Sequence, residues 1–242
     1  MKAIKFHCLQ YSIVCGLLLM CLPVKAQWAV GLQAGYTHNS LTTSSGYFYD
    51  RVYYPQGGLT IGIPVNYAFT EWFSLGAEAA FVQKSYDARR SGYFDILHEK
   101  VQNNYFSMPV YANFSFGGTR LRGFMNVGAY WGAWLSSYRN GAIYCNFTDK
   151  TPDYVLGIED ENHIYYYDEK LEFDSRRDNR FEAGAMLGAG ISYFISSNIK
   201  IFGECRYYYS LTDMQKNYMK KQVPRYNNTF AFQAGFMFLF NK

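Results

Sequence analysis

Charged side chains that could pair, conduct ions or catalyse recur on one face of several alternating segments of this sequence. Glu204 and Arg206 are two residues apart, so they would share one face of a β-strand, and Glu78 occupies the same kind of face in another segment. The same alternation adds Arg122, Glu182 and Lys200. Buried charges require partners of opposite sign, so these residues could form a structural ion-pair network, line a gated pore or provide acid–base chemistry.

The alternation that carries these charges recurs eight times along the chain. Its clearest copy runs from Leu59 to Phe69, where odd positions are apolar and even positions are small, polar or proline. We predict strands over residues 28–37, 59–69, 73–83, 105–116, 121–135, 181–193, 199–209 and 230–240. A tilted transmembrane strand needs roughly 9–11 residues, and the copies have about that length. The sequence therefore predicts an all-β fold, an eight-stranded antiparallel up-and-down transmembrane β-barrel.

The connections between the predicted strands alternate between short and long. Tight turns are expected at residues 70–72, 117–120 and 196–198, and long loops at residues 41–56, 85–104, 136–180 and 211–228. Within the third loop, residues 164–167 and 171–173 could extend a hairpin beyond the membrane. Short periplasmic turns and long extracellular loops are the layout of outer-membrane barrels, and an even strand count places both mature termini in the periplasm.

The interior of an eight-stranded barrel is narrow enough for side chains to fill. We therefore expect the six charges to form an ion-pair network in the lumen. Judged by distance from the tight turns, Glu78, Glu204 and Arg206 should lie at middle depth, Arg122 and Lys200 near the periplasmic end, and Glu182 nearer the outer end.

Residues 1–26 have the features of a cleaved signal peptide, which leaves residues 27–242 as the barrel domain. Lys2 and Lys5 precede an apolar run that is too short for a membrane-spanning helix, and residues 24–26 form a small-x-small cleavage site. A lipoprotein with Cys21 is the alternative, although Met20 is larger than the small residue that usually precedes a lipidated cysteine. Cys145 and Cys205 remain in the mature chain, and we expect no disulfide between them.

Composition supports a membrane location and gives no reason to propose nucleic acid as a partner. Aromatic residues make up 20% of the chain, with 24 tyrosines and 20 phenylalanines, as two interfacial girdles require. Removing Lys2, Lys5 and Lys25 with the leader reduces the 23 basic residues to 20, against 19 acidic residues. The mature chain is therefore almost neutral.

Two prolines conflict with the strand assignment. Pro64 and Pro109 fall inside the second and fourth predicted strands, where a missing N–H normally argues against a central strand. Both are predicted to face inward, and we expect a β-bulge to absorb each of them.

Several segments resemble the PorT-like family of bacterial outer-membrane β-barrels. Residues 104–110 are similar to that family's strand with an internal proline, residues 182–190 to its glycine-rich strand, and residues 206–211 to its Arg-Tyr-x-Tyr-Gly-Leu segment, with Ser210 in place of the glycine. The resemblance extends over essentially the whole mature chain. It implies an eight-stranded barrel in the outer membrane and no single shared activity.

Signals for an enzyme or a metal site are weak. His38, His98 and His163 have no serine or cysteine at recognisable nucleophile spacing, although a triad needs only spatial proximity. The acidic residues 159–161 could attract a divalent cation but lack the spaced aspartates of a calcium loop. We predict no enzyme activity, no cofactor and no metal.

The leading functional prediction is a monomeric outer-membrane barrel with a filled lumen, which anchors surface loops for structural or interaction roles. We expect outer-membrane lipids as partners, and extracellular proteins or glycans as candidate partners of the tyrosine-rich loops. One alternative is a narrow channel for small solutes. Another is a soluble periplasmic lipocalin-like barrel that binds an apolar ligand, which would need the apolar faces to point inward. The phenylalanines of residues 230–240 would overcrowd such a lumen.

Overall fold

The computed structural model describes residues 27–43, 51–90, 97–144, 164–216 and 224–240, so the predicted leader, Cys145 and His163 lie outside the described residues. The strands within these ranges are β1 (Gln27–Thr43), β2 (Arg51–Ala68), β3 (Phe73–Arg90), β4 (His98–Gly117), β5 (Leu121–Tyr144), β6 (Ile164–Lys170), β7 (Phe181–Phe194), β8 (Ile199–Ser210) and β9 (Arg225–Phe240). No helix in these ranges is long and apolar enough to cross a membrane.

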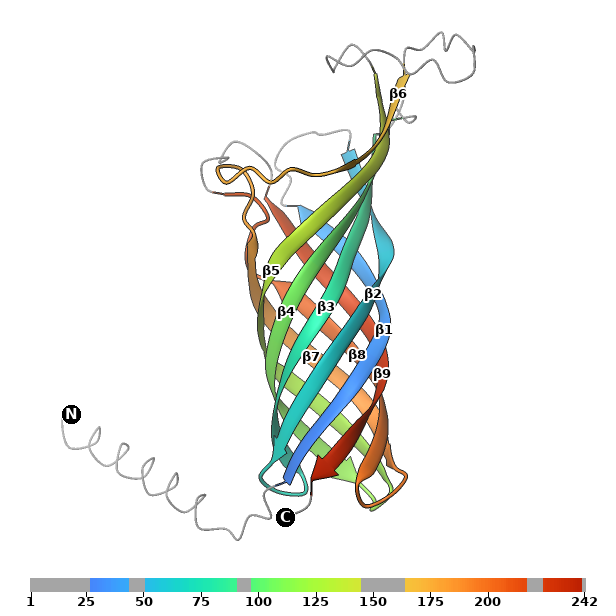
Figure 1. Ribbon diagram of the computed structural model, residues 1–242, viewed down its shortest axis with the longest axis vertical. Helices are drawn as coiled ribbons and strands as arrows, with labels where there is room; N and C mark the ends of the chain where they lie inside the picture. Colours follow the sequence, from blue (N-terminus) through green and yellow to red (C-terminus); the bar gives the residue numbers. More distant parts are fainter. Residues whose placement is uncertain (1–26, 44–50, 91–96, 145–163, 217–223, 241–242) are drawn as a thin grey trace, which may run out of the picture.

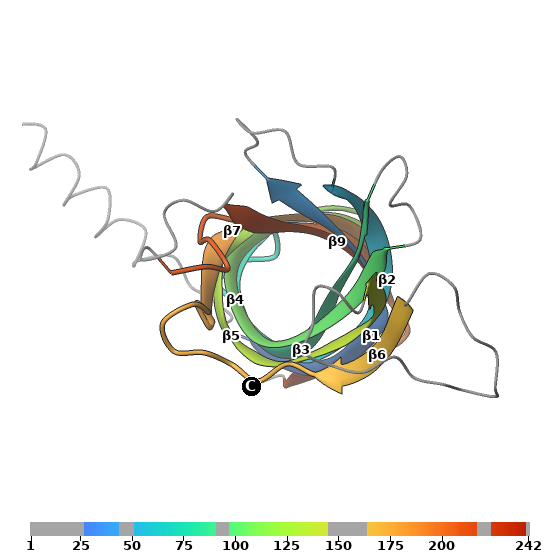
Figure 2. The same cartoon turned by 90° about the horizontal axis from the view of Figure 1, so that it is seen from above.

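Eight of these strands close into a ring. Each pairs antiparallel with its neighbour in the order β4-β3-β2-β1-β9-β8-β7-β5, and a further β4–β5 pairing closes the circle. Figure 2 shows this ring from above, and Figure 1 shows the tilted wall with the tight turns at one end. The predicted up-and-down eight-stranded barrel is confirmed.

The apolar face of every predicted strand points away from the lumen. On β2, Leu59, Ile61 and Ile63 are 64%, 58% and 49% exposed, whereas the intervening Thr60 is 4% exposed. Exposed apolar side chains in such a continuous band require a hydrocarbon environment, because water would make this surface strongly unfavourable. The orientation also opposes the lipocalin-like alternative, which needs the reverse arrangement.

The strands continue well beyond the apolar band at the end opposite the tight turns, so much of the predicted outer loops is strand. The pairing of β2 with β3 reaches Arg51↔Arg90, and that of β4 with β5 reaches Glu99↔Gly141. The predicted loops at residues 41–56 and 85–104 were therefore wrong over much of their length. On β3 and β4 the outward face becomes polar there, whereas Tyr86, Ala88 and Val101 form a buried apolar cluster on the inward face. The alternation of a lipid-facing strand therefore ends although the backbone pairing does not.

The predicted hairpin beyond the membrane is present in part. β6 pairs with the outer end of β5, from Tyr144↔Ile164 to Tyr138↔Lys170, and rises above the ring in Figure 1. Residues 171–173 do not extend this strand.

The two prolines face inward as predicted, but neither is absorbed by a bulge. Both are buried, and the β1–β2 and β3–β4 ladders are interrupted beside them with no change of register. Because Pro64 and Pro109 keep their pairs with Glu78 and Tyr130 on the opposite sides, each missing N–H faces the interrupted ladder. The bulges lie elsewhere, between Gln56 and Thr60 and between Asn104 and Tyr105.

A charge on the lipid face should destabilise the barrel in a depth-dependent way. Val127 is 48% exposed near the middle of the apolar band of β5. Val127→Arg should lower the free energy of unfolding by about 2–4 kcal/mol, measured by urea titration in phosphatidylcholine vesicles with tryptophan fluorescence. The matched change Gln102→Arg, on the outward face beyond the band, should cost about 1 kcal/mol or less. Equal losses would contradict this placement of the membrane.

Candidate functional site

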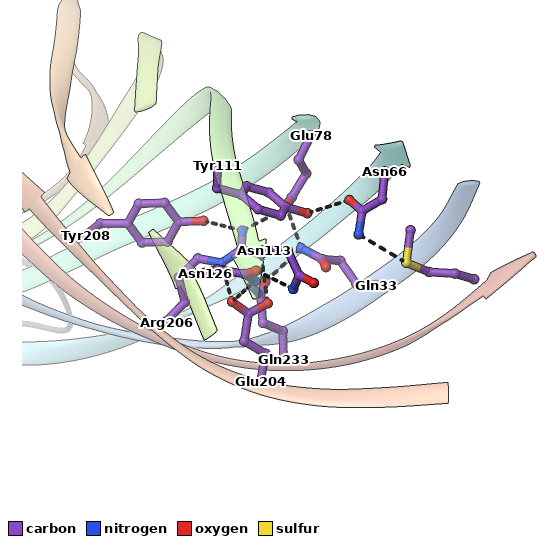
Figure 3. A network of polar contacts seen from close by, with 11 residues as sticks. Gln33, Asn66, Glu78, Tyr111, Asn113, Asn126, Glu204, Arg206, Tyr208 and Gln233 are labelled. Carbon is purple, nitrogen blue, oxygen red and sulfur yellow. Dashed lines mark hydrogen bonds and ion pairs between the residues drawn. The ribbon is translucent and has the colours of Figure 1, made fainter. Parts of the chain in front are cut away.

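An arginine held by two glutamates lies at the centre of the lumen. Arg206 on β8 is 1% exposed. Its Nη1 lies 2.7 Å from Glu78 Oε2, while its Nε and Nη2 lie 3.0 and 2.8 Å from Glu204 Oε1 and Oε2. Arg206 also donates a hydrogen bond to the Tyr208 hydroxyl, 3.0 Å away (Figure 3). This Arg206 cluster joins β3 to β8 across the barrel axis.

The sequence positions the Arg206 cluster through strand alternation and glycines. Glu204, Arg206 and Tyr208 share the inward face of β8 because they are two residues apart. A Cβ atom at Gly188 would overlap Glu204 Oε1, and one at Gly62 would lie 2.5 Å from Glu78 Oε1. Both distances are far below van der Waals contact, so these glycines leave the space that the carboxylates occupy.

Carboxamides complete the coordination of the two carboxylates. Gln33 donates to Glu78 Oε1 at 2.6 Å and Asn126 to Glu204 Oε1 at 2.8 Å. Asn113 donates in turn to Asn126 at 2.6 Å (Figure 3). Each oxygen of both carboxylates therefore accepts at least one hydrogen bond from a side chain of the barrel.

A second ion pair lies nearer the outer end. Lys84 Nζ is 2.6 Å from Glu182 Oε1, which also accepts a hydrogen bond from the Tyr130 hydroxyl at 2.8 Å. The ammonium group lies 5.0 Å from the ring centroids of Tyr105 and Tyr130 and 5.8 Å from that of Tyr208. Both charged side chains are almost completely buried, so this pair adds a second barrier across the lumen.

Sequence reasoning missed Lys84 because the third strand was predicted to end at residue 83. The signal was present, since Lys84 continues the even-numbered inward positions that include Glu78.

An apolar lid covers the outer mouth. Trp134 packs against Tyr105 with ring centroids 5.9 Å apart and against Phe173 at 4.9 Å, and Met214 belongs to the same cluster. Phe173 and Met214 come from two different connections, residues 171–180 and 211–216. Backbone hydrogen bonds join the two, including Asn179 N–H to Met214 O at 2.9 Å.

Asp178 fastens this lid from the extracellular side. Its Oδ1 accepts from Arg177 Nε at 2.8 Å and its Oδ2 from the Asp174 N–H at 2.9 Å, and its backbone forms a bridge with Gln215. Burial of Asp178 alone would raise the pKa of its carboxyl. The hydrogen bonds from Arg177 and Asp174 outweigh that effect and hold the pKa below its usual value.

The six predicted charges therefore do not form one network. Glu78, Glu204 and Arg206 lie together, and Glu182 pairs with Lys84 instead. Arg122 turns toward the periplasmic turns, where it donates to Glu71 O at 2.8 Å and lies 3.6 Å from the Glu71 carboxylate. The Lys200 side chain has no hydrogen bond or ion pair within the described part of the chain.

Lys200 lines a cavity on the periplasmic side of the Arg206 cluster. The cavity offers only about 20 Å³ of space that water can occupy, and Glu204 and Asn126 lie along its wall. Most of its polar lining residues are bonded to one another, as Figure 3 shows for Asn113 and Asn126. The lumen is thus filled at middle depth and keeps only a small cavity toward the periplasmic turns.

The described residues group no three His, Cys, Asp or Glu side chains that could hold a metal ion. The acidic residues 159–161 lie outside the described ranges. Cys205 is exposed on the outward face of β8.

Comparison with known proteins places the chain in a family. The model of the outer membrane protein beta-barrel domain matches residues 23–216, most of the chain. The chain belongs to this family. It is therefore an outer-membrane β-barrel protein, located in the cell outer membrane and in contact with its lipids. No curated protein matches the sequence.

Solved structures similar to this outer-membrane barrel have low sequence identity. Ail, the attachment invasion locus protein of Yersinia pestis, in complex with the heparin analogue sucrose octasulfate, is 14% identical with a TM-score of 0.39, over 88% of this chain and 99% of Ail. OprG from Pseudomonas aeruginosa is 10% identical with a TM-score of 0.47, over 90% and 97%. The Escherichia coli protease OmpT is 10% identical with a TM-score of 0.48, over 90% and 98%.

Removing Arg206 should destabilise the barrel strongly, because it would leave two buried carboxylates without their cation. Arg206→Met should cost about 3–5 kcal/mol in the free energy of unfolding. The triple variant Glu78→Gln, Glu204→Gln, Arg206→Met, which removes all three charges, should recover at least half of that loss. Urea titration in vesicles measures both. The control Arg122→Gln should cost about 1 kcal/mol or less, because its partner Glu71 is exposed. An unchanged free energy of unfolding in Arg206→Met would contradict this role of the ion pairs.

The lid should loosen in acid. A carboxyl whose pKa is lowered on folding contributes stability that is complete above its unfolded pKa of 3.8 and is lost as the pH falls through the folded value. Hydrogen exchange, corrected for intrinsic rates, should therefore show lower protection of residues 174–180 as the pH falls from 6 to 3. Asp178→Asn should show low protection already at pH 6. Protection that is independent of pH in the wild type would rule out this fastening role.

Proposed function

We propose that this protein is a closed, non-enzymatic outer-membrane barrel that anchors an extracellular surface for contact with proteins or glycans. The burial of the Arg206 cluster is the observation that carries the proposal. Its guanidinium is 1% exposed and is bonded to carboxylates from opposite sides of the barrel, so it fills the lumen at middle depth.

Two further layers support closure. The Lys84–Glu182 pair fills the lumen above the Arg206 cluster, and the lid around Trp134 covers the mouth. A non-enzymatic role is favoured because every oxygen of the two central carboxylates already accepts a hydrogen bond from Arg206, Gln33 or Asn126. We also infer a monomer, since every strand of the ring pairs with two neighbours in the same chain.

A narrow channel is the second candidate, and the periplasmic cavity favours it. The cavity reaches Glu204 from the periplasmic side, so movement of the Arg206 cluster would extend an aqueous path toward the outer mouth.

Two finer assignments belong to the same proposal. The segments at residues 104–110, 182–190 and 206–211 support a place among PorT-like barrels, and we do not extend the secretion role of that family's founding member to this chain. We further propose that residues 1–26 are a signal peptide and that the mature chain begins at Gln27. The intact mass of protein extracted from membranes tests this cut.

A closed lumen predicts that the protein conducts no ions across a lipid bilayer. Purified wild-type protein in planar lipid bilayers should give no frequent stable openings at ±100 mV. The control is Arg122→Gln, which should be equally silent because Arg122 lies outside the Arg206 cluster. If the wild-type protein opens frequently and stably, and Arg206→Ala changes these openings, the closed-anchor proposal is wrong and the channel is supported.

A further inference from the structure

A basic and aromatic surface lies on the outward face of the wall, where β2, β3 and β4 continue beyond the apolar band. Tyr54 is paired with Asp87, and Asp87 is paired with Lys100, so these side chains form one row across the three strands. Arg89 lies two residues further along the same face of β3. We call Tyr54, Asp87, Arg89 and Lys100 the Arg89 surface.

Within this surface, Arg89 is held in one orientation. Its Nε and Nη2 lie 2.9 and 2.8 Å from Asp87 Oδ2, and its guanidinium carbon lies 5.3 Å from the centroid of the Tyr54 ring. The Asp87 side chain is completely buried, whereas 54% of the Arg89 side chain is exposed. The buried carboxylate and the ring thus fix an exposed cation that keeps further N–H donors for an external acceptor.

Such an arginine suits an anionic oxygen ligand. A guanidinium is always charged, and its planar donors match phosphate and carboxylate groups. Lys100, exposed beside Asp87, adds a second positive charge. Because Arg89 is already oriented, less side-chain entropy is lost when a ligand binds. Tyr54 is 47% exposed and offers an apolar edge beside the charges.

The height of the surface indicates what lies next to it. The outward apolar band ends at Phe81 on β3 and Phe106 on β4. Asp87 and Lys100 lie about six residues beyond, roughly 20 Å along the strands at 3.3 Å per residue, or about 15 Å above the band after a tilt of about 40°. The polar interface of a bilayer adds only about 6 Å to each side of the hydrocarbon core. The surface therefore lies above phospholipid headgroups, at the level of glycolipid sugars, and faces sideways along the membrane.

We propose that the Arg89 surface binds the phosphorylated saccharide headgroups of glycolipids in the outer leaflet. Arg89 contacts the anionic group, Lys100 neutralises a second charge, and Tyr54 packs beside the sugar ring. This inference rests on the proposed function in one respect, since it requires the long strand ends to be extracellular.

The test uses the mature protein in nanodiscs of phosphatidylcholine that contain a phosphorylated rough-type lipopolysaccharide. After extraction into mild detergent, native mass spectrometry counts the glycolipid molecules retained per barrel. The double variant Arg89→Gln, Lys100→Gln should reduce retention at least fivefold. The control Arg176→Gln, an exposed arginine of the lid connection, should leave it unchanged. Removing the phosphates from the glycolipid should reduce its retention by the wild-type protein to the same low level.

Three results would overturn the proposal: unchanged retention in the double variant, an equal loss in Arg176→Gln, or wild-type retention that does not depend on phosphate. The delipidated oligosaccharide tests whether the ligand is a glycolipid, because binding as tight as that of the intact glycolipid would point to a free acidic polysaccharide instead.

Bilayer conductance separates this proposal from the proposed closed, anchoring role of the barrel. If the double variant retains glycolipid as the wild type does and the bilayers stay silent, only the Arg89 surface is rejected. If retention depends on phosphate but the wild-type protein conducts, only the closed-anchor proposal is rejected.

Discussion

The closed interior of an eight-stranded barrel must hold its polar side chains without bulk water, and the rest of the structure depends on how that space is filled. Arg206 cannot be buried alone, so Glu78 and Glu204 approach it from opposite sides. Their approach requires strand positions with no side chain, which explains the glycines at Gly62 and Gly188. A large central cation therefore determines the small residues of the neighbouring strands.

Charge balance links the central layers to the cavity below them. Glu78, Glu204 and Glu182 contribute three formal negative charges, against two positive charges from Arg206 and Lys84. The remaining negative charge is matched by Lys200, which lines the same periplasmic cavity as Glu204. Lys200 thus balances the formal charge of the lumen, although no side-chain contact within the described residues pairs it directly with a carboxylate.

The sequence predicted the wall of the barrel better than its ends. Alternation decides which face meets lipid wherever one face is apolar, so the orientation of Leu59, Ile61 and Ile63 could be predicted from residue types alone. Beyond the band the alternation on β3 reverses, with Tyr86 and Ala88 inward and Asp87 and Arg89 outward, so the pattern of a lipid-facing strand no longer applies although pairing continues to Arg51↔Arg90. The central trio followed from strand faces, but Arg122 did not join it, because depth along a strand does not reveal whether a long side chain turns inward or toward a turn. Lys84 was missed for the simpler reason that its strand was predicted to end at residue 83, whereas β3 continues to Arg90.

Residues inside the barrel and residues on its outer wall differ in how freely they can be substituted. Each residue of the Arg206 cluster is constrained by several others, so a change at Arg206 requires compensating changes at Glu78, Glu204 and the glycines beside them. Side chains on the outward face beyond the band, such as Lys100, meet no packed neighbour across the lumen. A protein built this way can acquire a new extracellular ligand by replacing outward residues of the extended strands while its filled lumen stays intact. The proposed closed lumen and the proposed recognition surface are therefore compatible for a physical reason: the lumen charges point inward from the wall, the Arg89 surface points outward, and on β3 the two lie on opposite faces of one strand.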